Sequence, residues 1–252
     1  MTVLDLRPAP GAAPALHRVV SHARTEAVLL LRNGEQLLLA LVIPAGILVV
    51  GRLAGGWFGG LEQLAPSVLA LAVWSSAFTS LAIATGFERR YGVLERLACT
   101  PLGRGGLLAG KALATTAVVL GQLLILSGLA LTLGWRPQWT WLSWFIAAVG
   151  ILLAGAVFAG WALALAGRVR AELTLALANL IYVVLLVGGG LVIPLSSYPT
   201  VVQPIVALLP TAALGELLRS AAQGAVLGWP LLVLVAWGLG AAAAAWKGFR
   251  WM

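Results

Sequence analysis

The stretch FERRYGVLERLACTPLGRGGLLAGKAL, from Phe87 to Leu113, decides how this chain is organised. It is the longest charge-bearing segment between the apolar blocks and holds four arginines, one lysine and two glutamates. The whole chain is 61% hydrophobic and only 10% charged. Because that composition is far from the average of soluble domains, the sequence predicts an integral membrane protein with one polar insert on one side of the bilayer.

Uncharged runs long enough to cross a bilayer divide the chain into six predicted spans. A helix needs about 20 apolar residues to cross the hydrocarbon core, and lipid offers the backbone no hydrogen-bond partners outside the helix. The predicted spans cover residues 36–53, 64–85, 112–135, 139–166, 173–192 and 225–246. We therefore predict an all-α integral membrane protein that forms a single domain over residues 1–252, with a six-span bundle over residues 35–252.

The segment from Leu173 to Gly215 carries no charge and leaves two interpretations open. It is long enough for two full spans, which would give seven spans in the chain. Three consecutive glycines at 188–190 and four prolines interrupt its second half, and proline breaks helices. We favour one span to about Val192, followed by a broken re-entrant segment on the extracellular side before the sixth span.

The distribution of basic residues orients the six-span arrangement. It places 13 lysines and arginines on the side of the two termini and of the 87–111 segment, against 3 on the other side. The positive-inside rule makes the first side cytoplasmic. Seven spans would give 12 against 4, so charge distinguishes the two counts only slightly. The expected location is the bacterial inner (cytoplasmic) membrane, with both termini cytoplasmic and lipid around the spans.

Residues 15–34 are predicted to form an amphipathic helix in the membrane interface, before the first span. Apolar residues recur there at Leu16, Val19 and Val20 and at later helical positions, with charged residues between them. Residues 1–14 are rich in proline and alanine, and we expect a disordered tail there. A solvated tail over both segments is the alternative.

Several function classes are excluded by the residues that the sequence lacks. Asp5 is the only aspartate, and His17 and His22 are the only histidines, so a Ser/His or Asp/Asp hydrolytic site within the membrane is not expected. Cys99 with two tail histidines cannot form a closed metal site. Gly103–Gly106 lacks the ending of a phosphate-binding loop. We therefore expect no metal, no bound cofactor and no enzymatic activity of the chain by itself.

Ion-driven carriers usually keep an ionisable group at mid-membrane depth. The predicted spans contain none in their interiors, and the two halves of the chain show no convincing repeat of the kind seen in such carriers. Energy for any transport is therefore expected to come from a partner.

A series of short motifs lies in a fixed order between the second and third predicted spans. The motif GVLERL begins at Gly92 and is followed by TPL from Thr100, by Arg104, and by GK at Gly110 and Lys111. In order, spacing and location this series resembles the permease subunits of type-2 ABC (ATP-binding cassette) exporters, nearest to the daunorubicin-resistance type. Cys99 and the GRGG run depart from the family pattern, which often has bulkier or more polar residues there.

The resemblance extends over nearly the whole chain. Ser197–Gly224, with Leu209 and Pro210 and then Leu218 and Arg219, is similar to the family's re-entrant extracellular region. The resemblance implies a pore-forming subunit that exports a hydrophobic or amphipathic compound, such as a drug, antibiotic, natural product or lipid. It also implies two copies of a cytosolic ATPase subunit that binds ATP and Mg, and a second permease copy or a paralogue. No nucleic-acid partner is expected.

The resemblance further implies that the ATPase docks on a short cytosolic coupling helix, about Val93 to Thr100. The expected docking residues are Arg89, Arg90, Tyr91, Gly92, Leu94, Glu95, Arg96, Leu97, Thr100 and Pro101. Arg168 and Arg170 in the loop GRVRAE are a second candidate contact. The alternatives are a solvated loop with internal ion pairs for the first set and a plain cytoplasmic anchor for the second.

The resemblance also implies that the second and fifth spans line the translocation path, so the candidates are the polar residues of these spans together with Trp74 and Phe78 as apolar neighbours. The candidates are Trp74, Ser76, Phe78, Thr79, Ser80, Asn179 and Tyr182. Ser76, Thr79 and Ser80 would share one face of an α-helix. Hydroxyl groups in membrane helices also commonly bond to their own backbone or to a neighbouring helix, which is the alternative.

Two other functions remain open from the sequence. The same family includes exporters of polysaccharides or glycolipids, which a path rich in aromatic side chains would favour. A non-transporting membrane anchor, immunity or sensory subunit is the other alternative. An ATP-hydrolysing partner would argue against that last reading.

Overall fold

The structure is a computed structural model that describes residues 11–54, 60–138 and 140–248, with the side chains of 35–39 and 245–248 excluded. Every regular element in those ranges is helical. Residues 11–14 precede the first helix without regular structure. The predicted disorder of the first ten residues lies outside the described ranges.

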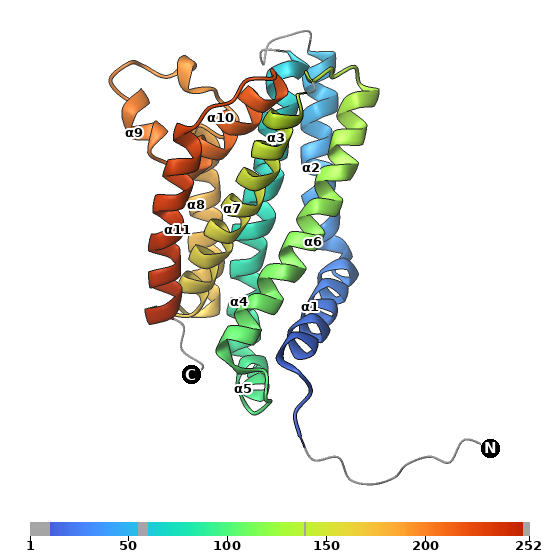
Figure 1. The fold of residues 1–252 in the computed structure, drawn as a ribbon, viewed down its shortest axis with the longest axis vertical. Helices are drawn as coiled ribbons and strands as arrows, with labels where there is room; N and C mark the ends of the chain where they lie inside the picture. The colour runs from blue at the N-terminus through green and yellow to red at the C-terminus, as the bar shows by residue number, and fades with distance from the viewer. Residues whose placement is uncertain (1–10, 55–59, 139, 249–252) are drawn as a thin grey trace, which may run out of the picture.

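The helices follow one another along the chain with short connections (Figure 1). Their bounds are α1 (Ala15–Arg32), α2 (Gly34–Leu53), α3 (Leu61–Trp74), the π-helix η1 (Ser75–Ser80), α4 (Leu81–Arg90), α5 (Val93–Ala98), α6 (Gly103–Thr132), α7 (Trp141–Ala166), α8 (Ala171–Gly188), the 3-10 helix η2 (Leu195–Ser197), α9 (Gln203–Ala207), α10 (Pro210–Ala222) and α11 (Trp229–Gly248).

Four of the described helices are long and apolar enough to cross a membrane. They are the continuous helix α3–η1–α4 over Leu61–Arg90, and α6, α7 and α8. Parts of α2 and α11 add shorter apolar helical stretches, Ala40–Leu53 and Trp229–Ala244. The helices lie side by side as a bundle (Figure 1). The structure is thus consistent with the predicted all-α membrane class.

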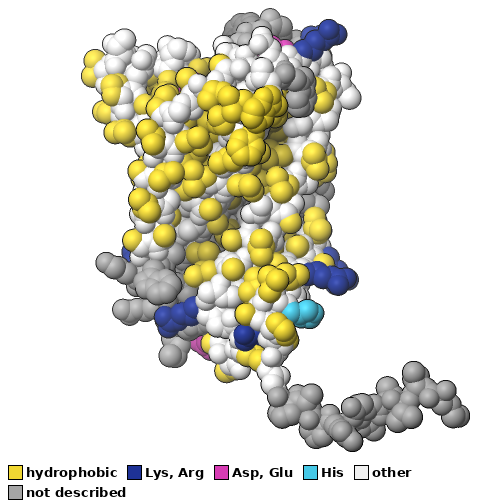
Figure 2. All heavy atoms as spheres, viewed as in Figure 1, with side chains coloured by type: hydrophobic (Ala, Val, Ile, Leu, Met, Phe, Trp, Pro, Cys, Tyr) yellow, Lys and Arg dark blue, Asp and Glu magenta, His cyan; other side chains and the backbone are white. Residues whose placement is uncertain are grey.

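The two ends of the bundle differ. α5 and α1 lie at one end, while α9 and α10 lie at the opposite end (Figure 1). On the face shown in Figure 2, apolar side chains cover the middle of the bundle, and most of the lysine, arginine and histidine side chains gather toward the end with α1 and α5. We call this the α5 end, and the other the α10 end.

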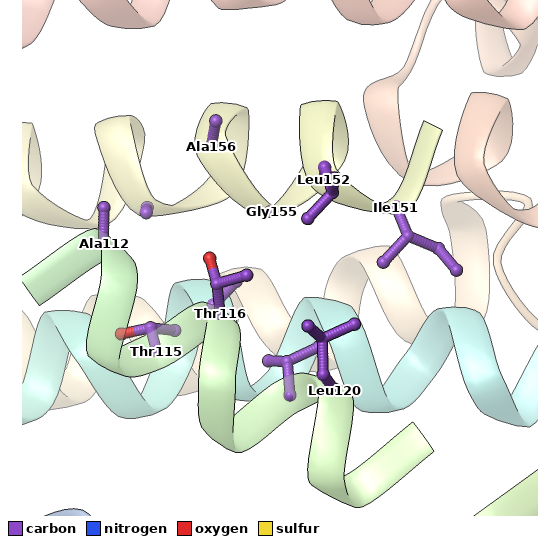
Figure 3. Close-up of a pocket in the computed structure, with 11 residues that line it drawn as sticks. Ala112, Thr115, Thr116, Leu120, Ile151, Leu152, Gly155 and Ala156 are labelled. Carbon is purple, nitrogen blue, oxygen red and sulfur yellow. The ribbon is translucent and has the colours of Figure 1, made fainter. Parts of the chain in front are cut away.

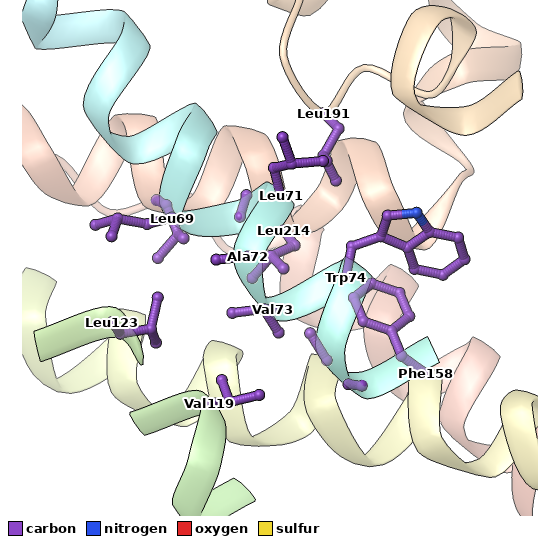
Figure 4. Packing of buried hydrophobic residues seen from close by; sticks show 14 of the residues in the cluster. Leu69, Leu71, Ala72, Val73, Trp74, Val119, Leu123, Phe158, Leu191 and Leu214 are labelled. Carbon is purple, nitrogen blue, oxygen red and sulfur yellow. The ribbon is translucent and has the colours of Figure 1, made fainter. Parts of the chain in front are cut away.

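Helix α3 lies at the centre of the core. Its alanines, among them Ala65 and Ala70, are fully buried and let neighbouring helices approach closely. Trp74 stacks on Phe78 with ring centroids 4.4 Å apart, and Phe158 of α7 meets Trp74 edge-on at 4.8 Å (Figure 4). Trp74 and Phe78, two candidates for the path, are therefore packed within the core of this chain.

Several helix ends differ from the predicted ones. The third long helix begins at Gly103 rather than at 112, so both Arg104 and Lys111 lie inside α6. Charge marked the predicted boundary, but a charged side chain does not stop a helix when it has partners or reaches water. The second helix likewise continues to Arg90, and the last begins at Trp229 rather than at 225.

Candidate functional site

The segment between α4 and α6 forms a short exposed helix at the α5 end. After Arg90 the chain reverses at Gly92, whose φ of 68° is in the left-handed region that favours glycine. Helix α5 follows over Val93–Ala98, two residues shorter than predicted. The Thr100 hydroxyl then donates a 2.6 Å hydrogen bond to the Leu97 carbonyl. A short helix therefore exists as a separate element at the predicted place.

The inner side of α5 packs on α6. Leu94 is 1% exposed and lies against Leu107, with Leu97, Leu102 and Leu108 around them. The sequence placed Leu94 among the residues that contact a partner, but its side chain is already enclosed by its own chain. Leu94 therefore holds α5 in place.

The outer side of α5 is polar and exposed. Glu95, Arg96, Thr100 and Pro101 are all exposed, and Tyr91 is 65% exposed while it stacks on Phe87. We call the exposed residues Tyr91, Glu95, Arg96, Thr100 and Pro101 the α5 face. Its charged pair offers both a carboxylate and a guanidinium to a partner, the groups that make the stronger hydrogen bonds.

Replacing Gly92 with alanine is expected to destabilise the α5 segment by about 1–2 kcal/mol, because an alanine at positive φ brings its Cβ too close to the backbone. An added Cβ would have its nearest neighbour at 3.7 Å, so steric contact adds little. Thermal unfolding in detergent measures the effect. Gly105→Ala is the matched control, because that helical position is open. Equal unfolding temperatures for both variants would contradict the prediction.

Two arginines of the first predicted docking set lie beside the second set in the structure. Arg89 and Arg90, at the end of α4, line the same cavity as Arg168 and Arg170 from the loop before α8. Arg90 forms an ion pair with Glu172, and Arg89 donates a 3.4 Å hydrogen bond to the Ala166 carbonyl. Sequence spacing could not show this, because nearly 80 residues separate the two sets.

A buried lysine connects the coupling segment to the N-terminal helix. Lys111 of α6 is 1% exposed, and its Nζ lies 3.0 Å from Glu26 Oε2 in α1 and 2.8 Å from Glu88 Oε1 in α4. We call these three residues the lysine triad. Sequence reasoning had placed Lys111 in a loop and gave neither glutamate a role. The available signal was a single charge on an otherwise apolar helix face in α6.

Helix α1 packs closely along α6 beside the lysine triad. An added Cβ at Gly110 would lie 2.4 Å from the ring of His22, so glycine at this position lets α1 approach. Burial lowers the pKa of His22 below its ordinary value, although Glu26 acts in the opposite direction. Burial thus favours the neutral imidazole, and Lys111 places a positive charge 3.0 Å from Glu26.

Polar side chains of the central helix bond to neighbouring helices. The Ser76 hydroxyl donates a 2.8 Å hydrogen bond to Gln122 Oε1 of α6, and Gln122 Nε2 in turn donates to the Ala40 carbonyl of α2. This is the arrangement given above as the alternative to path lining. Sequence reasoning did not single out Gln122, although it is a lone amide in a long apolar helix.

The predicted shared face of Ser76, Thr79 and Ser80 rested on α-helical spacing, but residues 75–80 form a π-helix. A π-helix bonds i to i+5 and so shifts which residues share a face. Ser76 and Ser80 line one small cavity of about 30 Å³ with Thr115, and Thr79 is not among its lining residues.

Internal cavities next to these residues are small. The one between α6 and α7, lined by Thr116 and Gly155 among others, has a volume of about 50 Å³ (Figure 3). Sites for drug-sized molecules typically measure about 300–1,000 Å³. On α8, by contrast, Asn179 is exposed and Tyr182 half-buried. A wider apolar groove of about 600 Å³ separates α2 from α8 and includes Ile43 and Val187.

The α10 end contains a buried arginine. Arg219 is 4% exposed and donates to Ser67 Oγ at 2.9 Å and to the carbonyls of Leu191 and Gly190 at 2.8 Å. It also pairs with Glu216 Oε1 at 2.9 Å, which accepts a hydrogen bond from the Leu195 amide. From the sequence, Arg219 was assigned to the side of the membrane opposite the two termini. In the structure its side chain is buried within the protein, where carbonyl and carboxylate oxygens replace water.

Comparison with known proteins identifies the family. The family described as ABC-2 family transporter protein matches residues 58–247. Two curated proteins of Mycobacterium tuberculosis, from strains CDC 1551 / Oshkosh and ATCC 25618 / H37Rv, both bear the name "Probable doxorubicin resistance ABC transporter permease protein DrrC" and are 27% identical to this chain over 187 residues. The match covers 72% of this chain and 65% of each relative. The family match spans most of the chain, so this protein belongs to the ABC-2 family of transporter proteins.

Proposed function

We propose that this chain is the membrane-spanning permease subunit of an ABC exporter and that a separate ATPase subunit docks on the α5 face. One observation carries the proposal: a short helix with an exposed charged side is fixed by Leu94 at one end of an apolar bundle. Such a rigid, protruding contact is suited to receive force from a soluble partner. Membership of the ABC-2 family and the printed names of the relatives support it.

A six-span arrangement is part of this proposal. Its spans are α2, α3–η1–α4, α6, α7, α8 and α11, with α5 and α1 on the cytoplasmic side of a bacterial inner membrane. Helices α9 and α10 lie together at the α10 end, where α8 ends and α11 begins (Figure 1). That placement supports a re-entrant segment over α9 and α10 rather than a seventh span. Both termini would then be cytoplasmic.

Movement of the docked helix would reach the bundle through two connections. Leu94 couples α5 to α6, and the lysine triad couples α6 to α4 and α1. Because both contacts are buried, displacement of α5 would be transmitted to the long helices rather than absorbed by a loose loop. ATP and Mg would be bound by the partner.

The proposed cargo is a hydrophobic or amphipathic compound. The groove between α2 and α8 is lined entirely by apolar residues and glycine, and its volume of about 600 Å³ falls in the range of drug-sized sites. Several side chains of α8, among them Leu180, Val184 and Val187, are exposed. A second permease copy facing α8 would cover them and enclose a path between the two chains.

The test is to purify the tagged chain from its native membranes in mild detergent, identify the proteins that accompany it and measure ATP hydrolysis. For the double variant Glu95→Ala/Arg96→Ala we expect the recovered ATPase subunit to fall by roughly tenfold or more, the loss expected for charge-assisted contacts. Arg136→Ala removes an exposed charge at the α10 end and is the matched control. Recovery of the chain without any ATPase subunit would refute the exporter and favour an anchoring or sensory role.

A further inference from the structure

Four arginines surround one recess at the α5 end. The recess has a volume of about 510 Å³ and is lined by the end of α4, the loop between α7 and α8, and the first turn of α8. Its lining residues are Gly86, Arg89, Arg90, Arg168, Val169, Arg170, Ala171 and Glu172. We call it the arginine pocket. Four arginines against one glutamate leave an excess of positive charge at one concave place.

The arginines in the pocket are unequally compensated. Arg90 is paired with Glu172, and Arg89 donates to a backbone carbonyl. Arg168 and Arg170 are exposed and form no ion pair or side-chain hydrogen bond with any described residue. Two guanidinium groups, each with a planar fork of donors, are thus left available at the mouth of the recess.

The first turn of α8 adds to this positive field. The helix begins at Ala171, and its N-cap residue, Arg170, makes no capping hydrogen bond with its side chain. The first N–H groups of a helix have no partner within the helix and carry a partial positive charge. Helices α4 and α8 approach each other closely at Gly86, which lines the pocket: an added Cβ there would lie 3.3 Å from Thr174.

We propose that the arginine pocket binds the phosphate of an anionic phospholipid headgroup. Guanidinium forks match phosphate geometry, and basic pockets between membrane helices on the cytoplasmic side bind anionic headgroups. The position favours a lipid over a free anion, because the pocket lies where α4 and α7 end and α8 begins, and Leu173 just beyond it is 52% exposed. The lipid assignment rests on the cytoplasmic placement of the α5 end proposed above, but not on the docking of an ATPase on the α5 face.

The test uses the full chain in mild detergent, titrated with phosphatidylglycerol, with phosphatidylcholine or with inorganic phosphate. Thermal unfolding and native mass spectrometry of retained lipid are the readouts. We expect phosphatidylglycerol alone to bind and to raise the unfolding temperature. Arg168→Gln/Arg170→Gln should weaken its apparent affinity by about 30-fold, the loss expected for two arginines near a membrane surface. The apparent affinity of the variant Arg168→Lys/Arg170→Lys should lie between those of the original protein and the glutamine variant, because lysine keeps the charge but lacks the planar fork of donors.

The matched control is Arg24→Gln/Arg104→Gln, which removes two exposed charges at the same end but outside the pocket. Equal weakening in this control would overturn the proposal in favour of general surface attraction. Equal stabilisation by inorganic phosphate would overturn the lipid assignment. Loss of a co-purified ATPase from the Arg168→Gln/Arg170→Gln variant, with its lipid response unchanged, would likewise overturn it and assign the two arginines to a protein contact.

Discussion

Replacing Lys111 with methionine is expected to destabilise the protein by about 3 kcal/mol, because removal of one partner from a buried ionic group leaves the others uncompensated. Glu26 and Glu88 would then lie close together with side chains only 12% and 21% exposed. For a chain of this size the unfolding temperature should fall by roughly 6–12 °C. Tryptophan fluorescence during heating in detergent measures it, and the chain has 11 tryptophans.

Two further variants separate the charge effect from a packing effect. Arg104→Met changes a basic residue on the same helix that is exposed, and its unfolding temperature should stay close to that of the original protein. The triple variant Lys111→Met/Glu26→Gln/Glu88→Gln should recover much of the lost stability, since an ionic group can be replaced by neutral residues at little cost. A triple variant as unstable as the single one would show that the lysine triad is not the cause.

Replacing Arg219 with methionine is expected to cost about 3–5 kcal/mol, the range for a broken buried ion pair. The change would leave the carbonyls of Gly190 and Leu191 without the guanidinium donor, and Glu216 would keep the Leu195 amide but lose its positively charged partner. The segment after α8 should then detach from α10. Limited proteolysis between residues 191 and 202, together with the unfolding temperature, measures this loss.

Arg219→Lys distinguishes the geometry of the donor from its charge. A lysine ammonium lacks the planar fork of arginine and cannot reach all four acceptors. The unfolding temperature and the protease resistance of Arg219→Lys should therefore lie between those of the original protein and Arg219→Met. Arg136→Met alters an exposed arginine at the same end and should leave proteolysis unchanged. If Arg219→Met resisted protease as well as the control did, the arginine would have no part in holding the segment.

Much of the architecture was predictable from the hydropathy of the chain and from the glycines and prolines that end helices. The predicted starts of the first, fourth and fifth spans lie within about two residues of the helices α2, α7 and α8. The short helix after Gly92 begins at the predicted residue, Val93, although it ends at Ala98, two residues before the predicted end. The predicted start of the third span was wrong by nine residues, since charge was used as its boundary and Lys111 is buried within the helix.

The candidate site was less predictable than the helices. The sequence selected the residues of the α5 face, but that Leu94 packs on α6 rather than on a partner could be seen only once the position of α6 was known. Among the path candidates, Ser76 bonds to Gln122 and Trp74 is packed against α7. A π-helix has no simple sequence signature, so the sequence could not show that the α-helical spacing used to group Thr79 with Ser76 and Ser80 does not apply there.

Glycines gave a further signal that sequence alone left ambiguous. The glycines at 188–190 were taken as a helix breaker, and α8 does end at Gly188. The structure adds a second reason for them, since an added Cβ at Gly190 would lie 2.6 Å from Ala212 in α10. Glycine is used both to end a helix and to let another helix approach closely. Only the position of the neighbouring helix shows which of the two reasons applies.

The sequence by itself determined that the chain is an apolar helical protein with a polar insert, and where most of its long helices lie. Transfer of a side chain from water to an apolar phase depends mainly on that side chain, so it can be read residue by residue. Only the tertiary structure shows which residues form the lysine triad, the Arg219 contacts and the arginine pocket. These join residues up to 152 positions apart, and their energies depend on distance and burial, which exist only once particular helices lie side by side.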